Sequence, residues 1–208
     1  ATCCPRGRAV WLSDFFALIS RMRYISRWGL MRSSIPENVQ EHSHMVAVLA
    51  HALGVIRRDV FHKPCDVGTL VCAALYHDAP EILTGDLPTP IKYHSQDITR
   101  AYQEVERVAS DKLVNMLPVG IQNEFTPLIS GEVGKDLKPL LKCADRLSAY
   151  IKCVEERKAG NLEFLSAERQ TRERIESMGL CEAEYFLENF MPAFEKNLDE
   201  LGTMSEED

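Results

Sequence analysis

Apolar residues recur along this chain with the period of an α-helix. In the clearest stretch they are spaced three and four residues apart, which places them on one helical face. That stretch contains Met45, Val46, Leu49, Ala52, Leu53 and Ile56. Similar stripes lie in residues 13–22, 66–77, 98–109, 125–129, 140–154 and 185–198. Because no segment shows the alternation of a half-buried strand, the pattern predicts an all-α fold.

Polar residues and helix breakers mark the expected ends of these helices. Ser13 and Asn38 are suitable N-caps, and Gly29 is a good terminator after the first helix. The segment 84–90, Thr-Gly-Asp-Leu-Pro-Thr-Pro, is predicted not to form regular helix. The sequence contains no repeat or linker. We therefore expect a single compact helical bundle over residues 11–201, with a flexible N-terminus at 1–10 and an acidic frayed tail at 202–208.

Composition and charge exclude several classes of function. The chain has 208 residues, of which 45% are apolar and 26% charged, as in ordinary globular proteins. A net charge of -7 argues against nucleic-acid binding, which requires clustered Lys and Arg. No apolar run is long enough to span a membrane, and residues 1–8 do not resemble a signal peptide. We therefore expect neither a nucleic-acid nor a membrane partner.

The cysteines favour a reducing compartment. The chain has seven, an odd number without CxxC spacing, which argues against a disulfide framework or a zinc ribbon. Cys72, Cys143 and Cys153 lie within apolar helical patterns and are expected to act as small core residues. The simplest expectation is a cytoplasmic protein.

Four residues could form a metal site. His42 lies on the inward face of the second predicted helix, where a lone histidine is more often a core residue that has found a hydrogen bond. His77 and Asp78 are adjacent at the end of an apolar stripe, and Pro80 disturbs the helix there, so both side chains could reach one point. Asp145 is flanked by apolar residues of another helix and is either a ligand or a simple rim carboxylate.

Two imidazoles and two carboxylates suit a divalent transition-metal ion. Such an ion can activate water and polarise a phosphoryl group. Between Asp78 and Asp145 the only further histidine is His94, so we expect one ion rather than two.

Four other residues carry possible chemistry. Glu81 and Asp86 follow the His-Asp pair and could transfer protons, although each alone is more simply a solvated loop charge or cap. Arg27 has the forked donor set that matches phosphate, and Trp28 offers an apolar wall for a base or sugar. The simpler interpretation of this pair is an ordinary helix end with a buried indole.

Taken in order, these motifs resemble those of the HD-domain phosphohydrolases, and with Arg27-Trp28 those of the bacterial 5′-deoxynucleotidases of the YfbR type. The motifs are Glu41-His42-Ser43, His77-Asp78-Ala79-Pro80-Glu81, Thr84-Gly85-Asp86-Leu87-Pro88-Thr89-Pro90 and Lys142-Cys143-Ala144-Asp145. The resemblance covers roughly residues 15–194. This chain departs from the family pattern at Pro80, where other members can carry a small polar residue. The departure bears on the direction in which the Glu81 side chain points.

The resemblance implies hydrolysis of deoxyribonucleoside 5′-monophosphates by a homodimeric enzyme. It implies one divalent ion, with cobalt or manganese favoured, held by His42, His77, Asp78 and Asp145. Glu81 would be the catalytic carboxylate, with Asp86 close to the phosphate or sugar. Arg27 would orient the phosphate, and Trp28 would help exclude a ribose 2′-hydroxyl. The residues expected to contact substrate are Arg27, Trp28, His42, Asp78, Asp86, Leu87, Pro88, Thr89 and Asp145.

Two alternatives remain at this point. The chain could be another HD-type hydrolase that acts on nucleoside triphosphates, cyclic nucleotides or a guanosine alarmone. It could also be a non-catalytic HD-like module that senses a ligand or serves in dimerisation. Such modules would be expected to lose ligands or nearby carboxylates, but this chain retains His42, His77, Asp78, Glu81, Asp86 and Asp145.

Overall fold

The apolar stripes of the sequence fold into α-helices, in a computed structural model that describes residues 12–92 and 94–202. Nothing is described of the side chains of Thr89 and Pro90. The predictions for residues 1–10, and for the tail beyond residue 202, lie outside the described residues. The α-helices are α1 (Phe15–Ile19), α2 (Val39–Val55), α3 (Val67–Tyr76), α4 (Glu81–Thr84), α5 (Thr89–Lys92), α6 (Gln96–Asn115), α7 (Val119–Ser130), α8 (Lys138–Lys158), α9 (Leu165–Glu176) and α10 (Cys181–Asn189).

Shorter helical turns extend or connect several of these helices. They are η1 (Ser20–Tyr24), the π-helical turn η2 (Ile56–Val60), η3 (Leu162–Phe164), η4 (Met191–Glu195) and η5 (Leu198–Glu200). Within the described residues there is no strand, only an isolated antiparallel bridge between Ser26 and Asn38. The predicted all-α class is therefore confirmed.

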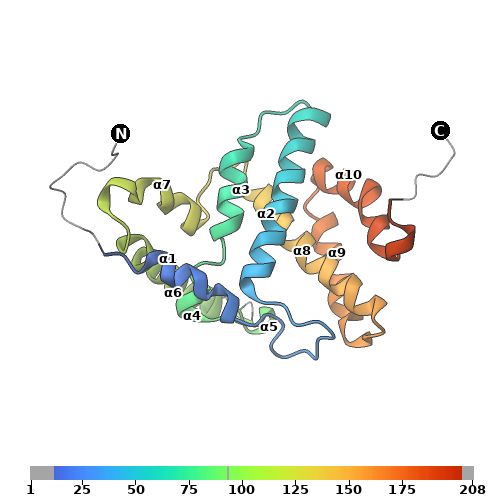
Figure 1. Cartoon of the computed structure of the whole chain (residues 1–208), viewed down its shortest axis with the longest axis horizontal. Coiled ribbons are helices and arrows are strands. Elements are labelled where there is room, and N and C mark those ends of the chain that lie inside the picture. Colours follow the sequence, from blue (N-terminus) through green and yellow to red (C-terminus); the bar gives the residue numbers. More distant parts are fainter. Residues whose placement is uncertain (1–11, 93, 203–208) are drawn as a thin grey trace.

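The centre of the molecule is formed by α2, which packs against α3 and α8 (Figure 1). Helices α1, α6 and α7 lie on one side of this centre, and α9 and α10 lie on the other. The main core is built from the stripes of the central helices, among them Val46, Leu53, Leu70, Leu140 and Leu147. No helix of the described part is long and apolar enough to cross a membrane.

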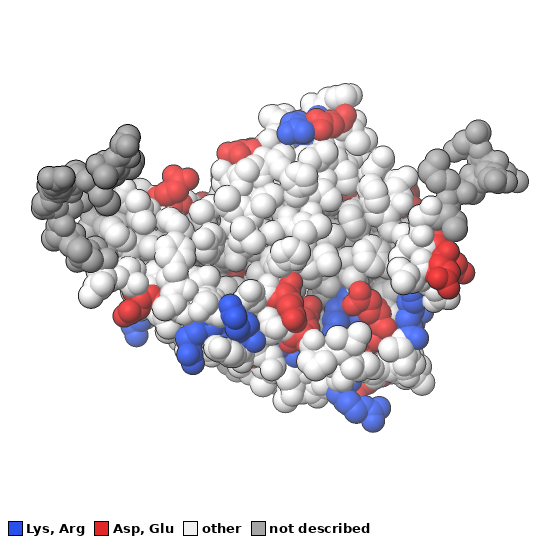
Figure 2. Space-filling model, in the orientation of Figure 1, with Lys and Arg blue, Asp and Glu red and all other residues white. Residues whose placement is uncertain are grey.

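A second, smaller apolar cluster lies beside the first. Phe15 of α1, Leu113 of α6, Ile129 of α7 and Ala79, which follows the His-Asp pair, are all buried in it. This cluster therefore fixes the turn that carries His77 and Asp78. On the face shown in Figure 2, charged side chains of both signs gather along the lower part and at the top edge, and the middle is mostly uncharged.

The structure corrects the predicted ends of two segments. Ser13 lies one residue before the N-cap position of the first helix, where its hydroxyl accepts a hydrogen bond from the Phe15 N–H at 3.3 Å and donates one to the Met116 carbonyl at 2.5 Å. Asp14 occupies the N-cap position instead. The segment 84–90 is only partly irregular, because Thr84 ends α4 and Thr89 begins α5. Proline is tolerated in the first turn of a helix, where the missing N–H has no partner to lose.

The expectation that Cys72 lies in the core was wrong. Cys143 and Cys153 are buried, but Cys72 is exposed on α3 because it points away from the core. The apolar face predicted for residues 98–109 is also exposed at Ile98 and Val108. The part of α6 that packs into the core lies further along, at residues 109–114.

Candidate active site

His42 is held by the first turns of α2. Asn38 and Glu41 form a capping box: the Asn38 side chain accepts from the Glu41 N–H at 3.0 Å, and the Glu41 carboxylate accepts from the Asn38 N–H at 3.2 Å. The cap fixes the start of the helix. The His42 ring is fully buried, with Nδ1 3.1 Å from Ser148 Oγ and Nε2 3.1 Å from Asp145 Oδ1 on α8.

His77 and Asp78 lie in the turn between α3 and α4, where Pro80 occupies the cap position of the next helix. The predicted disturbance of the helix is therefore present. His77 Nδ1 donates a hydrogen bond to the Ala74 carbonyl at 2.8 Å. This bond orients the ring so that Nε2 faces Asp78. Asp78 Oδ2 lies 3.2 Å from His77 Nε2 and 3.6 Å from His42 Nε2.

Three of the four expected ligands form one group. The potential ligand atoms of His42, His77 and Asp145 all lie within 4.8 Å of one another. Asp78 is not part of that group, but its carboxylate is in contact with both rings. Residues far apart in the sequence, from α2, from the end of α3 and from α8, thus meet at one point.

The donor set fits a metal ion. Among the described residues, His77 Nε2 is buried without a hydrogen-bond partner, although a carboxylate faces it. An ion requires Nε2 of each ring to be unprotonated, and both Nδ1 atoms already have partners that allow this: Ser148 Oγ and the Ala74 carbonyl. Imidazole nitrogen and carboxylate oxygen together suit a divalent transition metal.

The charged side chains of this group change one another's pKa values. Burial opposes a charge on His77, but the carboxylates of Asp78 and Asp145 outweigh it and raise its pKa to about 9. Burial would also raise the pKa of Asp78, but the positive charges of His77, His42 and Arg27 hold that pKa well below its usual range. The carboxylates therefore stay ionised, and a metal ion would have to displace the proton from His77 Nε2.

Arg27 and Trp28 lie beside this group, in the segment that precedes α2. Arg27 Nη1 is 3.5 Å from Asp78 Oδ2, and Arg27 Nε donates to Glu37 Oε2 at 3.2 Å. Trp28 Nε1 donates to the same Glu37 oxygen at 2.8 Å, and its ring lies against Phe164, with the ring centroids 5.3 Å apart. The structure therefore places a guanidinium next to the expected metal ligands and an indole next to the guanidinium.

Glu81 begins α4 and is 8% exposed, and its Oε2 is buried without a hydrogen-bond partner among the described residues. Burial, and after it the charges of Asp78 and Asp86, raise the pKa of Glu81 to about 9. The pKa of the partly buried Asp86 is also raised by burial, which Arg27 opposes. Two carboxyl groups with raised pKa values therefore lie near the cluster, where either could take part in acid–base chemistry.

The remaining predicted substrate residues follow Asp86. Leu87 and Pro88 are partly buried, and the side chain of Thr89 lies outside the described residues. Gly85, directly before Asp86, has φ 74° and ψ 163°, a conformation that is essentially restricted to glycine. Its carbonyl accepts a hydrogen bond from the Thr84 hydroxyl at 3.0 Å.

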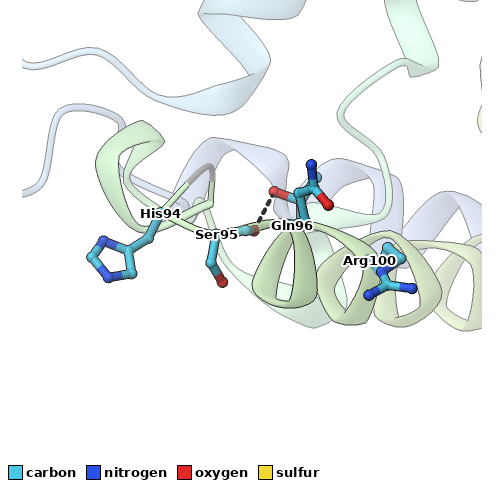
Figure 3. Close-up of a pocket in the computed structure, with 5 residues that line it drawn as sticks. His94, Ser95, Gln96 and Arg100 are labelled. Atoms are coloured by element: carbon cyan, nitrogen blue, oxygen red, sulfur yellow. Dashed lines mark hydrogen bonds between the residues drawn. The ribbon is translucent and has the colours of Figure 1, made fainter.

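A hollow of about 610 Å³ lies elsewhere, at the start of α6, and is lined by His94, Ser95, Gln96, Thr99 and Arg100. Figure 3 shows that the side chains of His94 and Arg100 lie apart and do not converge on one point. Ligand sites have polar groups that converge, so this hollow offers little for recognition.

Two residues that contact the predicted site were not predicted from the sequence. Ser148 lies three residues after Asp145, so helical spacing alone could have placed its hydroxyl on the same face. Glu37 bridges Arg27 and Trp28, and no local signal could have revealed this, because the bridge depends on how the chain folds back between residues 28 and 37.

The helix arrangement matches solved HD-domain phosphohydrolases. One from Listeria innocua has a TM-score of 0.73 at 22% identity, and the match covers 87% of this chain and 88% of the other. DatZ of cyanophage S-2L, solved bound to dA and one catalytic Zn2+ ion, has a TM-score of 0.65 at 19% identity, covering 90% of this chain and 100% of the other. The helical bundle with its histidine–aspartate cluster defines an HD-domain fold.

Sequence comparison narrows this class. The profile of the family described as 5′-deoxynucleotidase YfbR-like matches residues 14–194. A 5′-deoxynucleotidase of Vibrio atlanticus is 44% identical over 190 residues, 91% of this chain and 98% of that relative. The 5′-deoxynucleotidase YfbR of Escherichia coli O127:H6 is 46% identical over 190 residues, 91% of this chain and 96% of that relative. The chain belongs to the 5′-deoxynucleotidase YfbR-like family, so the resemblance found from the motifs is confirmed, as is the enzyme class, a phosphoric monoester hydrolase.

Proposed function

We propose that this chain hydrolyses deoxyribonucleoside 5′-monophosphates to deoxynucleoside and phosphate at the site formed by His42, His77, Asp78 and Asp145. The observation that carries the proposal is the contact of Arg27 with Asp78 at 3.5 Å, because it sets a phosphate-binding group against the ligand cluster. Membership of the family supports the same conclusion.

We infer that the cluster holds one divalent ion, cobalt or manganese in preference to others. The solved neighbour DatZ carries a catalytic Zn2+ ion, so the choice of metal has to be measured. When bound, such an ion supplies positive charge next to the phosphate and makes water a stronger nucleophile at neutral pH. In this chain both histidines, the Asp78 carboxylate and the Asp145 carboxylate would hold it.

The protein residues supply alignment and proton transfer. Arg27 presents its N–H groups to the phosphate oxygens and neutralises their charge, which carries much of the rate in phosphoryl transfer. Glu81, with its raised pKa, can hold a proton near neutral pH and exchange it with the attacking water or the leaving 5′-oxygen. Asp86 lies where the charges of Arg27, Asp78 and His42 act on it, next to the expected position of the phosphate or sugar.

Selectivity for deoxyribose would come from Trp28 and the segment after Gly85. The Trp28 ring is partly buried, and its packing against Phe164 and its hydrogen bond to Glu37 hold it in place. Leu87, Pro88 and Thr89 would complete the wall around the nucleoside.

We also infer that the active form is a homodimer in the cytoplasm, as the resemblance implies and the cysteines predict. Val105, Ile98 and Val108 leave an exposed apolar stripe along α6, which a second copy could cover. Light scattering should give the mass of a dimer, and Val105→Glu should shift it towards the monomer. A monomeric mass for the unsubstituted protein would contradict the inference.

The function is tested by phosphate release from matched deoxy- and ribonucleoside 5′-monophosphates, with each of several divalent ions and with a chelator. We expect release from the deoxy substrates that requires the ion. Triphosphates and cyclic nucleotides belong in the same panel, because faster turnover of either would favour another HD-type hydrolase. No bound metal and no phosphate from any substrate would favour the sensor alternative.

A further inference from the structure

Arg27 and Trp28 share one acceptor, the Oε2 atom of Glu37. Arg27 Nε lies 3.2 Å from this atom and Trp28 Nε1 lies 2.8 Å from it. The Glu37 side chain is only 15% exposed, so these bonds form largely away from water. One carboxylate oxygen therefore fixes the two side chains that the proposed function assigns to phosphate and sugar.

Backbone contacts also hold Arg27, Trp28 and Glu37 close to one another. The Arg27 N–H donates to the Glu37 carbonyl at 2.9 Å, and Ser26 pairs with Asn38 in the antiparallel bridge beside it. Trp28 has a φ of 59°, a left-handed conformation that a bulky residue rarely adopts. Such strain persists only where surrounding contacts over-determine it, and the indole bond to Glu37 is one of those contacts.

Glu37 also orders the charges around Arg27. The guanidinium lies between two carboxylates, with Glu37 at Nε and Asp78 at Nη1. Because Nε is engaged by Glu37, the planar group can rotate little, and its remaining N–H groups are held towards the ligand cluster. A side chain without an acceptor in place of Glu37 would leave the orientation of Arg27 to Asp78 alone.

We propose that Glu37 is a positioning residue that couples phosphate alignment to deoxyribose selectivity, an inference that rests on the proposed function. Through Arg27 it sets the turnover number for all substrates. Through Trp28 it sets the ratio of kcat/KM between deoxy- and ribonucleoside monophosphates. Removal of the carboxylate should therefore both slow the enzyme and relax its choice of sugar.

Two substitutions separate these effects. Glu37→Ala removes both bonds, and we expect the deoxy-to-ribo ratio to fall about tenfold, the equivalent of one lost hydrogen bond at a recognition site. Glu37→Gln keeps a carbonyl oxygen for the indole but loses the charge next to Arg27. It should therefore lower kcat while keeping most of the selectivity. A ratio that is unchanged in Glu37→Ala would overturn the proposal.

Glu41→Ala is the matched control. Glu41 bonds to the backbone of Asn38, next to Glu37, and its carboxylate bonds to neither Arg27 nor Trp28. This variant should lower thermal stability and leave the substrate ratio unchanged. If it relaxes the ratio as much as Glu37→Ala does, general loosening of the segment explains the effect and the proposal is wrong.

A second measurement needs no substrate. In a Trp11→Phe background Trp28 is the only tryptophan, since the chain has two. Acrylamide should quench its fluorescence more strongly in Glu37→Ala than in Glu37→Gln or Glu41→Ala. Equal quenching in all three would show that Glu37 does not anchor the indole. Failure of the wild type to hydrolyse any nucleotide would instead refute the proposed function, and the quenching would still report on Glu37.

Discussion

At the scale of single residues, the two histidines of the site are oriented by different partners. His77 Nδ1 donates to a backbone carbonyl at 2.8 Å, so its ring is fixed by the turn that carries it. His42 Nδ1 faces the hydroxyl of Ser148, a side chain on another helix, at 3.1 Å. The orientation of His42 can therefore be altered by substitution, whereas that of His77 cannot be altered without changing the backbone.

We predict that Ser148→Ala weakens metal binding about 10- to 100-fold, because partners of ligating histidines contribute affinity of that order. Calorimetric titration with manganese or cobalt would measure it. Ser110→Ala is a matched control, since Ser110 is also a buried helical serine but bonds only to the Glu106 carbonyl of its own helix. Equal metal affinity in the two variants would show that Ser148 does not support His42.

Glu81→Gln should lower kcat by about 10²- to 10⁴-fold, the usual contribution of a general acid or base. The amide has the size of the carboxyl group but cannot exchange a proton. Substrate binding, measured as Kd by equilibrium titration, should change little. Near-normal turnover in this variant would remove Glu81 from the mechanism and leave Asp86 as the proton-transfer group.

What could be predicted about single residues depended on helical position. His42 falls on the inward face of its helix by spacing alone, and it is fully buried. The spacing could not show that Asp145 would face it, because the two residues are 103 positions apart in the sequence and lie on different helices. Glu37 was missed for the same reason: its partners are defined by the fold of a loop, which leaves no periodic signal.

At the scale of elements, the connection between α4 and α5 carries the residues expected to surround the nucleotide. Gly85 turns the chain there with φ 74° and ψ 163°. Glu81 lies one helical turn before this glycine and Asp86 directly after it. The angle between the two carboxyl-bearing segments is therefore set by one backbone position.

Gly85→Ala should destabilise this conformation by about 1–3 kcal/mol, because residues with a Cβ are strained there. We expect lower turnover with a raised KM, since Asp86 and the residues after it would shift. Gly120→Ala is the opposite control: Gly120 lies inside α7, and a Cβ added there would meet nothing within 4 Å. It should stabilise the protein by up to about 1 kcal/mol. Thermal unfolding together with steady-state kinetics would measure both.

Long, strongly periodic elements were predictable and short ones were not. Helices α2 and α8 follow their apolar stripes because each packs one face into the main core. The apolar stripe of residues 98–109 does form a helix, α6, but its residues Val105 and Val108 are exposed in the structure. Periodicity shows that a face is apolar and cannot show what covers it. The one-turn helices α4 and α5 are too short for any period to appear.

At the scale of the whole molecule, the loop of residues 26–38 is tied to α8 by Glu156. This carboxylate is 1% exposed and accepts hydrogen bonds from the backbone N–H groups of Ser34 and Ile35, at 2.7 Å and 3.2 Å. Lys152 and Asn161 also donate to it, at 2.5 Å and 2.8 Å. Burial would raise the pKa of Glu156, but these bonds lower it to about 2.

This arrangement predicts how stability depends on pH. Because the folded protein holds the pKa of Glu156 below its ordinary value of 4.5, the stabilisation is complete above about pH 5. It should be lost as the pH falls towards 2. Glu156→Gln should lower the free energy of unfolding by about 2–4 kcal/mol at pH 6, since Lys152 loses a buried partner. It should also flatten the decline between pH 5 and pH 3 in urea unfolding.

Glu176→Gln is the control for this measurement. Glu176 pairs with Arg172 on the surface of α9, where both side chains are about half exposed, and such pairs contribute little. Its pH profile should follow that of the wild type. A wild-type profile that is flat down to pH 3 would contradict the prediction.

The pairing of Ser26 with Asn38 makes the 26–38 loop a closed ring of chain, whose ends meet and whose middle is held by Glu156. Such a ring can open as a unit. It contains Arg27, Trp28 and Glu37, but His42 lies beyond it in α2. Under the proposed function, recognition of the nucleotide is therefore separable from retention of the ion. One local opening would move Arg27 and Trp28 together and leave His42, His77 and Asp145 assembled.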